Sequence, residues 1–234
     1  MKTITAQELL NKYKKAVGVD KQHGFCVITN QKARPGGVMI ACMNPSHSGT
    51  EDILLDYLDE KCKNGGFWEP KHIMMGKYDG LTAFVDLLPL RFTEQTLVDN
   101  ISNSYRGKLL EVTQKYIEYM RPKLIIVANK SSLYYWGSND DATWMGYKLA
   151  DTGKKLKGKW IIYKILGLKT DKEDRINKEF FNESDNKTNL EGSLLLHYRQ
   201  VTKWRHPKPE ETISEYDIEG LLKEIDSDWE KTLY

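Results

Sequence analysis

Two polar residues stand where apolar runs end or break, and their side chains are the first candidates for chemistry. Asn44 directly follows the run at 38–43, which is too short for a helix, and Asp86 lies inside the run at 81–90. The amide of Asn44 can orient a water molecule without being ionised, although the residue also suits a simple turn cap. An unpaired buried carboxylate is strongly unfavourable, so Asp86 requires a backbone donor, Arg91 or a ligand as its partner.

Both residues are positioned by strands that proline residues end. The run at 38–43 is almost unbroken in apolar character, which is typical of a strand buried on both faces of a parallel sheet. Pro45 and Pro89 cannot donate a ladder hydrogen bond, so each predicted strand stops there. The loop after Asn44 therefore lies at the carboxyl end of a central strand, where open α/β sheets bind their ligands.

Strands and helices alternate along the chain, which predicts an α/β fold with a mostly parallel sheet. Thr5 with Glu8 forms a capping box for the first helix, and Ser214 with Asp217 caps an amphipathic helix within 212–234. We expect further strands at 25–29, 123–128 and 193–198, helices at 51–62, 93–120 and 132–137, a hairpin of 147–149 with 160–165, and loops at 67–80 and 168–191. Loop 168–191 is a long connection or an insertion, and a chain of 234 residues predicts one domain.

The composition argues against several classes of protein. An apolar fraction of 40% allows a buried core, and the formal charge of +2 gives no general field for nucleic acid, so such a partner requires a local basic patch. Cys26, Cys42 and Cys62 form no C-x-x-C pair and have apolar neighbours, which favours reduced, core-packed thiols in a cytoplasmic protein. No apolar run approaches the about 18 residues of a membrane span, and no two histidines show metal-ligand spacing. We therefore expect neither a membrane segment nor a metal or other cofactor.

Four short motifs occur in an order that resembles the uracil-DNA glycosylase superfamily. They are M-N-P-S at 43–46, F-V-D-L-L-P-L-R at 84–91, R-P-K-L-I-I-V at 121–127 and R-H-P-K-P at 205–209. An uncharacterised bacterial branch with an N-P-S first motif is more similar still, and the resemblance spans about residues 37–209. It implies a three-layer α/β/α sandwich with a short, mostly parallel central sheet, in which an extruded base enters a pocket at the carboxyl ends of the strands.

The resemblance also implies roles for individual residues. Asn44 matches the residue that orients the hydrolytic water, His206 matches the late histidine that bonds the base carbonyl, and Asp86 stands where the family has a base-reading asparagine. Ser46 is a further base-binding candidate. No family motif matches Phe67 or Trp68, but as aromatic residues in a predicted loop either is a candidate for stacking on a base, or alternatively for covering the sheet edge. The candidate phosphate contacts are Arg91, Arg199, Lys203, Arg205 and Lys208.

The chain departs from the family pattern at two positions that bear on function. Ser46 replaces a glycine and is followed by His47, and this bulk narrows the predicted pocket. Asp86 replaces an asparagine, and an ionised aspartate only accepts hydrogen bonds, so it repels the O4 atom of uracil and prefers an amino group. We therefore expect a DNA base-excising glycosylase, or a related base- or nucleotide-recognising hydrolase, that is not specific for uracil. The alternative is a non-catalytic nucleic-acid-binding module on the same scaffold.

Overall fold

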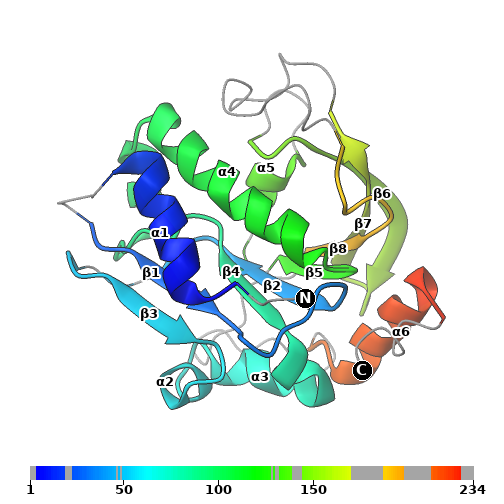
Figure 1. The fold of residues 1–234 in the computed structure, drawn as a ribbon. Helices are drawn as coiled ribbons and strands as arrows, with labels where there is room; N and C mark the ends of the chain where they lie inside the picture. Colours follow the sequence, from blue (N-terminus) through cyan, green and yellow to red (C-terminus); the bar gives the residue numbers. More distant parts are fainter. Residues whose placement is uncertain are drawn as a thin grey trace.

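A sheet of six strands forms the centre of the molecule (Figure 1). The structure is a computed structural model, and it describes residues 4–18, 23–45, 47, 49–127, 129, 132–138, 144–169, 187–197 and 212–227. The strands lie in the order β4-β2-β5-β8-β7-β6. Their bounds are β2 Val38–Cys42, β4 Ala83–Asp86, β5 Leu124–Val127, β6 Tyr147–Leu156, β7 Trp160–Leu168 and β8 Leu194–His197.

The first four strands of this order are parallel, as the apolar runs predict. β2 pairs with β4 through Cys42 and Asp86, with β5 through Ala41 and Val127, and β5 pairs with β8. Every residue of β2, β4 and β5 is buried, which is what a strand covered on both faces requires. The parallel ladder therefore brings the carboxyl ends of all four strands to one edge of the sheet.

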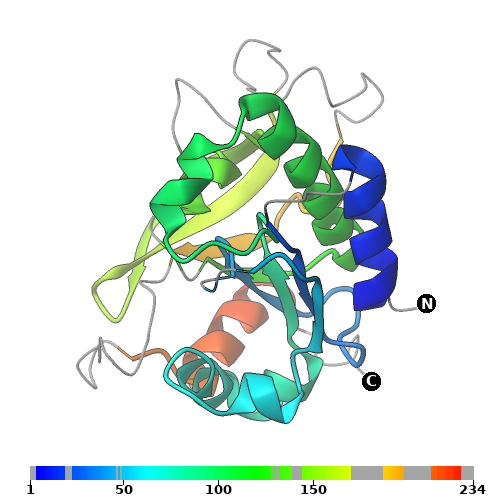
Figure 2. The ribbon, with the colours of Figure 1, turned by 90° about the vertical axis from the view of Figure 1, so that its left-hand side faces the viewer.

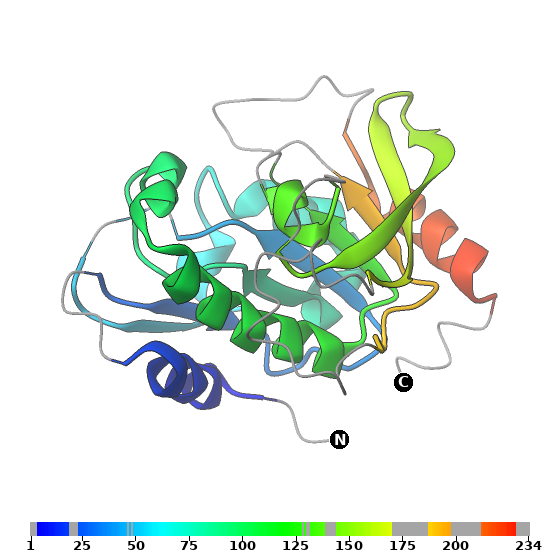
Figure 3. The same cartoon turned by 90° about the horizontal axis from the view of Figure 1, so that it is seen from above.

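An antiparallel hairpin and a small second sheet lie at opposite ends of the central sheet (Figure 3). The predicted hairpin is confirmed as β6 and β7, and β7 extends the sheet by pairing antiparallel with β8. At the other end, β1 (Cys26–Thr29) and β3 (Ile53–Asp56) form a parallel pair of their own. The amide of Cys26 donates to the carbonyl of Pro89 at 2.8 Å, so β1 covers the outer side of the segment that follows β4.

Helices pack on both faces of the sheet (Figures 1 and 2). One face carries α1 (Ala6–Val17), α4 (Asn103–Met120) and α5 (Ser132–Trp136) over alternate strand residues such as Met39 and Val85. The opposite face carries α3 (Glu69–Met75) and α6 (Glu215–Ile225) over Ile40 and Phe84. The remaining helices are α2 (Glu60–Lys63) and the 3₁₀ helices η1 (Gly76–Leu81) and η2 (Gln95–Asn100).

Local signals at the helix ends agree with the structure. Both expected capping boxes are present, at Thr5 with Glu8 and at Ser214 with Asp217. α4 ends at Arg121, which adopts the left-handed conformation, with φ 44°, directly before Pro122. This tight exit returns the chain into β5, where the amide of Lys123 donates to the carbonyl of Gly37 at 2.9 Å.

The helix predicted at 51–62 is wrong. Residues 53–56 form the strand β3, and the helical turn α2 begins only at Glu60. Apolar residues at 53, 54, 57 and 58 fit one face of a helix, but the same short pattern also fits a half-exposed strand. Pairing with β1, which is distant in sequence, decides between the two, because the amide of Ile53 donates to the carbonyl of Phe25 at 2.7 Å.

Two other boundaries also differ from the prediction. The stretch 67–80, expected as a loop, contains α3 and most of η1. Its helical turn starts near Pro70, a residue that is favoured in the first turn because it has no amide hydrogen to leave unbonded. The helix expected over 93–120 is divided, with η2 separated from α4 by Ser102, whose side chain accepts from the amide of Tyr105.

Two further predictions fall partly outside the described residues. Of the segment 168–191, residue 168 ends β7 and residues 187–191 lead into the turn before β8, whereas 170–186 lie outside the described residues. Within 212–234, the amphipathic helix is present as α6, and residues 228–234 lie outside the described part of the chain.

Candidate functional site

The carboxyl edge of the parallel strands gathers polar side chains from all four of them. Asn44 follows β2, Asp86 ends β4, Asn129 follows β5 and His197 ends β8. The register places Asp86 beside Cys42 and His197 beside Val127, so these positions lie along one edge. Asn44 and Asp86 therefore lie on neighbouring strands at one edge of the sheet, and Asn129 and His197 lie along the same edge.

Asn44 has an unused acceptor inside the protein. The residue is 6% exposed, and its Nδ2 donates to the carbonyl of Pro45 at 3.0 Å. Its Oδ1 is buried and accepts no hydrogen bond from any residue that the structure describes. The backbone on either side of Asn44 is hydrogen-bonded, because the amide of Leu88 donates to the carbonyl of Met43 at 2.9 Å and the amide of Phe92 donates to the carbonyl of Pro45 at 3.2 Å. The amide is therefore fixed in place with an acceptor to offer.

Asp86 is a buried carboxyl group on the α3 side of the sheet. It is 7% exposed, and no described residue donates a hydrogen bond to its side chain. Burial raises the pKa of Asp86 to about 7, and the positive charge of Lys71 offsets part of that rise. The carboxyl group therefore changes its charge near neutral pH, which suits a group that exchanges protons or hydrogen bonds with a ligand.

The cation near Asp86 is Lys71 and not Arg91. Lys71 is 2% exposed, its Nζ donates to the carbonyl of Phe67 at 2.7 Å and lies 3.3 Å from the centroid of the Phe67 ring. Burial lowers the pKa of Lys71 to about 8, against the opposing influence of Cys42 and Asp86. Arg91 instead donates from Nη1 to the carbonyl of Glu51 at 2.7 Å, and the guanidinium lies where a Cβ on Gly49 would stand.

Aromatic rings cover the sheet beside this buried pair. The ring centroids of Trp68 and Phe84 are 5.1 Å apart, those of Phe67 and Trp68 are 4.9 Å apart, and Tyr57 stacks on Phe84 at 5.8 Å. Phe67 and Trp68 are half-buried against the core of this face. These rings therefore pack on the sheet, and a base could reach only their exposed parts.

A second polar group lies behind the aromatic cluster and serves stability. His72 Nδ1 lies 2.7 Å from Asp79 Oδ1, His72 Nε2 lies 2.8 Å from the carbonyl of Cys62, and the Tyr57 hydroxyl donates to Asp79 at 2.9 Å. Burial by itself lowers the pKa of His72, but these bonds and the charge of Asp79 together raise it above the ordinary value. Both ring nitrogens face acceptors, so the protonated imidazole fits this position best.

Replacing His72 with glutamine is expected to destabilise the protein more at acidic than at alkaline pH. The raised folded-state pKa means that the stabilisation is fully present below the ordinary value of 6.5 and is lost as pH rises through the folded-state pKa. We expect a loss of about 2 kcal/mol at about pH 5.5 and a clearly smaller loss at about pH 9, measured by urea unfolding. Equal losses at both pH values would show that the imidazole is neutral in the folded protein.

The cysteine residues are packing groups in the structure. Cys26, Cys42 and Cys62 are buried free thiols. Burial raises the pKa of each to about 12, so the nucleophilic thiolate is not formed near neutral pH. The nearby charge of Asp86 acts in the same direction on all three.

Many of the predicted site residues lie outside the described part of the chain. Among these are the candidate catalytic residue His206 and the candidate base contact Ser46. The others are the candidate phosphate contacts Arg199, Lys203, Arg205 and Lys208. Their roles stay predictions, and so does the meeting of His206 with Asn44 and Asp86. His47, which is described, is exposed.

The sequence analysis missed Lys71, Asn129 and His197. Lys71 carried no signal, since nothing in the local pattern distinguishes a buried lysine from an exposed one. Asn129 and His197 did carry one, because each stands at the end of an apolar run that the analysis had assigned to a parallel strand. Asn129 is 5% exposed, and its carbonyl accepts from the Ser132 hydroxyl at 2.9 Å.

The chain matches no protein-family model, no curated protein and no solved structure. In the described part of the chain, no three or more His, Cys, Asp or Glu side chains are grouped so that they could hold a metal ion. Among the described helices, none has both the length and the apolar character needed to cross a membrane.

Proposed function

We propose that the carboxyl edge of the sheet recognises a nucleobase and that the protein is a base-excising glycosylase or a related base-recognising hydrolase. One observation carries this proposal. Neighbouring parallel strands end in Asn44 and Asp86, both more than nine-tenths buried, and the described residues leave the Asn44 oxygen and the Asp86 carboxyl without hydrogen-bond donors. Buried polar groups are normally hydrogen-bonded, so unused ones at a strand end favour a bound ligand or water.

The chemistry fits these groups. Cleavage of an N-glycosidic bond develops positive charge on the sugar and negative charge on the departing base, and it needs a positioned water. The fixed Oδ1 of Asn44 accepts a hydrogen bond from such a water and orients it without a change of charge. Asp86 lies one strand away and offers its carboxyl group to the edge of the base.

Burial changes the base preference that the sequence suggests. The expected rejection of uracil assumes that Asp86 is ionised, whereas burial raises the pKa of this residue to about 7. A protonated carboxyl group has one donor and one acceptor, as an amide has, and it can pair with uracil or with cytosine. An ionised one only accepts, so discrimination against uracil is expected to become strong above about pH 7.

The order of motifs and the architecture support a glycosylase-like fold. Asn44 and Asp86, from the first two motifs, end adjacent strands, the third motif leads into β5, and helices cover both faces of the sheet. This three-layer, uracil-DNA glycosylase-like assignment belongs to the proposal. The alternative of a non-catalytic nucleic-acid-binding module is favoured by the low exposure of Asn44 and Asp86, which limits access to both.

The test is base excision from oligonucleotides that carry uracil, hypoxanthine, alkylated or oxidised bases, followed by alkaline strand cleavage. We expect cleavage of at least one of these substrates by the wild type. With Asp86→Asn, we expect uracil to be handled alike at about pH 6 and about pH 8, because the amide does not titrate. The exposed substitution Asp99→Asn is the matched control and should behave as the wild type. Tight binding of the same oligonucleotides without any cleavage would establish the non-catalytic alternative.

A further inference from the structure

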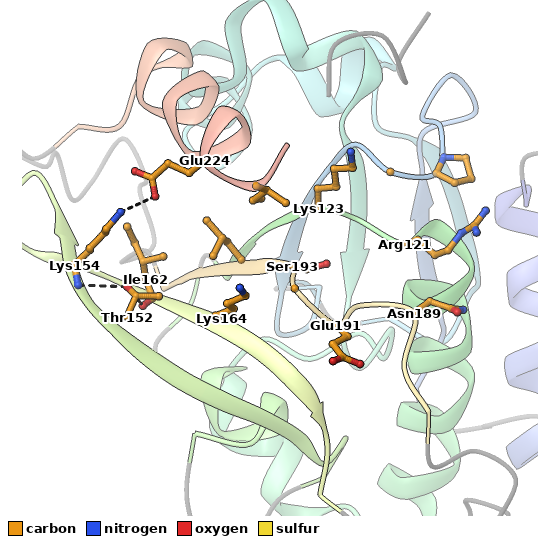
Figure 4. A pocket seen from close by; sticks show the side chains of 15 residues that line it. Arg121, Lys123, Thr152, Lys154, Ile162, Lys164, Asn189, Glu191, Ser193 and Glu224 are labelled. Carbon is orange, nitrogen blue, oxygen red and sulfur yellow. Dashed lines mark hydrogen bonds and ion pairs between the residues drawn. The ribbon is translucent and has the colours of Figure 1, made fainter. Parts of the chain in front are cut away.

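A pocket of about 690 Å³ lies at the opposite edge of the sheet from Asn44 and Asp86 (Figure 4). It is bordered by the amino ends of β5 and β8, by the β6–β7 hairpin and by the last turn of α6. Sites for small molecules are typically about 300–1,000 Å³ in volume. The size of this pocket therefore suits a small organic ligand.

Basic side chains outnumber acidic ones on the wall of this pocket. Four basic side chains line it and only two carboxylates do, those of Glu191 and Glu224. Lys154 Nζ lies 2.9 Å from Glu224 of α6, and Lys123 forms an ion pair with Asp226, which directly follows α6, so two of the cations are already neutralised. Lys164 is exposed and makes no hydrogen bond or ion pair with any residue that the structure describes. An ammonium group is thus available for an anion.

A polar anchor and an apolar floor complete the pocket. Ser193 is only 7% exposed, it lines the pocket, and its hydroxyl has no hydrogen-bond partner in the described part of the chain. Ile162 and Leu194 are buried and form an apolar floor, and Ile225 also lines the pocket. Lys164 pairs with Leu194 in the register of β7 and β8, so both side chains lie on the face that α6 covers. A cation, a free hydroxyl and an apolar surface therefore line one cavity.

We propose that this pocket binds a small organic phosphate, such as a nucleotide, with Lys164 and Ser193 contacting the phosphate and the apolar body lying over Ile162 and Leu194. A phosphate accepts hydrogen bonds from both an ammonium and a hydroxyl group. The Lys154–Glu224 pair is half exposed, at 61% and 50% of the side chains, and such pairs are weak, so Lys154 can turn toward the anion. This site is separate from the proposed base-binding edge and goes beyond the proposed function.

The experiment is isothermal titration of the full chain with AMP, with ATP, with inorganic phosphate and with a short single-stranded oligonucleotide. We expect the nucleotides to bind more tightly than inorganic phosphate, and the binding to weaken as salt is raised. Lys164→Ala is expected to weaken nucleotide binding about tenfold and Ser193→Ala about threefold. Lys155→Ala, an exposed lysine of the same hairpin that does not line the pocket, should leave it unchanged.

Several results would overturn the proposal. If Lys164→Ala and Lys155→Ala weaken nucleotide binding equally, the binding is a general effect of surface charge and not of this pocket. Inorganic phosphate that binds as tightly as AMP would remove the role of the apolar floor. An oligonucleotide that binds through Lys164 while the nucleotides do not would make the pocket part of a nucleic-acid surface. Thermal melting of each variant verifies folding, which we expect to be retained for Lys164→Ala because this side chain is exposed.

Discussion

Asp86→Asn is expected to stabilise the protein at about pH 8, by as much as about 4 kcal/mol, and to have little effect near pH 4. The pKa of Asp86 rises from 3.8 to about 7 because burial disfavours the ionised carboxylate. Between about pH 4 and about pH 7, the folded state therefore keeps a proton that the unfolded chain has released. The wild type loses stability as pH rises through this window, whereas asparagine has no proton to lose.

The neighbouring lysine makes the gain smaller than this upper value. Lys71 lies in the same buried region, and the charge of Asp86 helps to keep its ammonium protonated. Removing that charge lowers the pKa of Lys71 further, and the resulting loss of stability cancels part of the stability gained at residue 86. The measurement is urea unfolding of wild type and variant from about pH 4 to about pH 8, with the exposed Asp99→Asn as the control. A variant that is less stable than the wild type at about pH 8 would show that a further group holds Asp86 ionised.

This behaviour bears on function as well as on stability. A carboxyl group that destabilises the fold at neutral pH is unusual in a position that serves packing alone. Such groups are frequent at sites where a ligand or a reacting group uses them. A stabilised Asp86→Asn variant with altered base preference would therefore support the proposed role of Asp86 directly.

Asn44→Ala is expected to lower the rate of base release by about 10²–10³-fold while leaving stability within about 1 kcal/mol of the wild type. The reason is that the Asn44 Oδ1 accepts nothing from the described residues, so its removal breaks no bond to them. Among the described residues, the substitution removes one hydrogen bond, from Nδ2 to the carbonyl of Pro45. Activity and stability should therefore separate at this residue.

The matched variants for this test are Asn44→Asp and Asn11→Ala. Asn44→Asp keeps an oxygen at the same place and should retain more activity than alanine. Asn11→Ala removes an exposed amide on α1, far along the chain from the site, and should leave the rate unchanged. Single-turnover rates measure the chemical step, and thermal melting measures the fold. An Asn44→Ala variant that is fully active would remove this residue from the proposed mechanism.

The elements that the sequence determined are those with local or strongly apolar signals. The runs at 38–43 and 123–128 predict buried strands, because they are short and almost wholly apolar, and β2 and β5 lie within them. The capping boxes at Thr5 and Ser214 depend on residues three apart, so they form wherever a helix starts there. Pro45 has no amide hydrogen to donate, so the strand β2 stops before it. This local signal alone places Asn44 at the carboxyl end of the strand.

Tertiary structure decided whatever depends on a partner distant in sequence. Residues 53–56 form a strand because their backbone pairs with β1, although their apolar pattern also suits a helix. Lys71 is buried because α3 packs on the sheet. Only in that position is its positive charge close enough to lower the pKa of Asp86. Hydrogen-bond ladders between strands and the desolvation of charges are properties of assembled neighbours, and one segment of sequence contains neither.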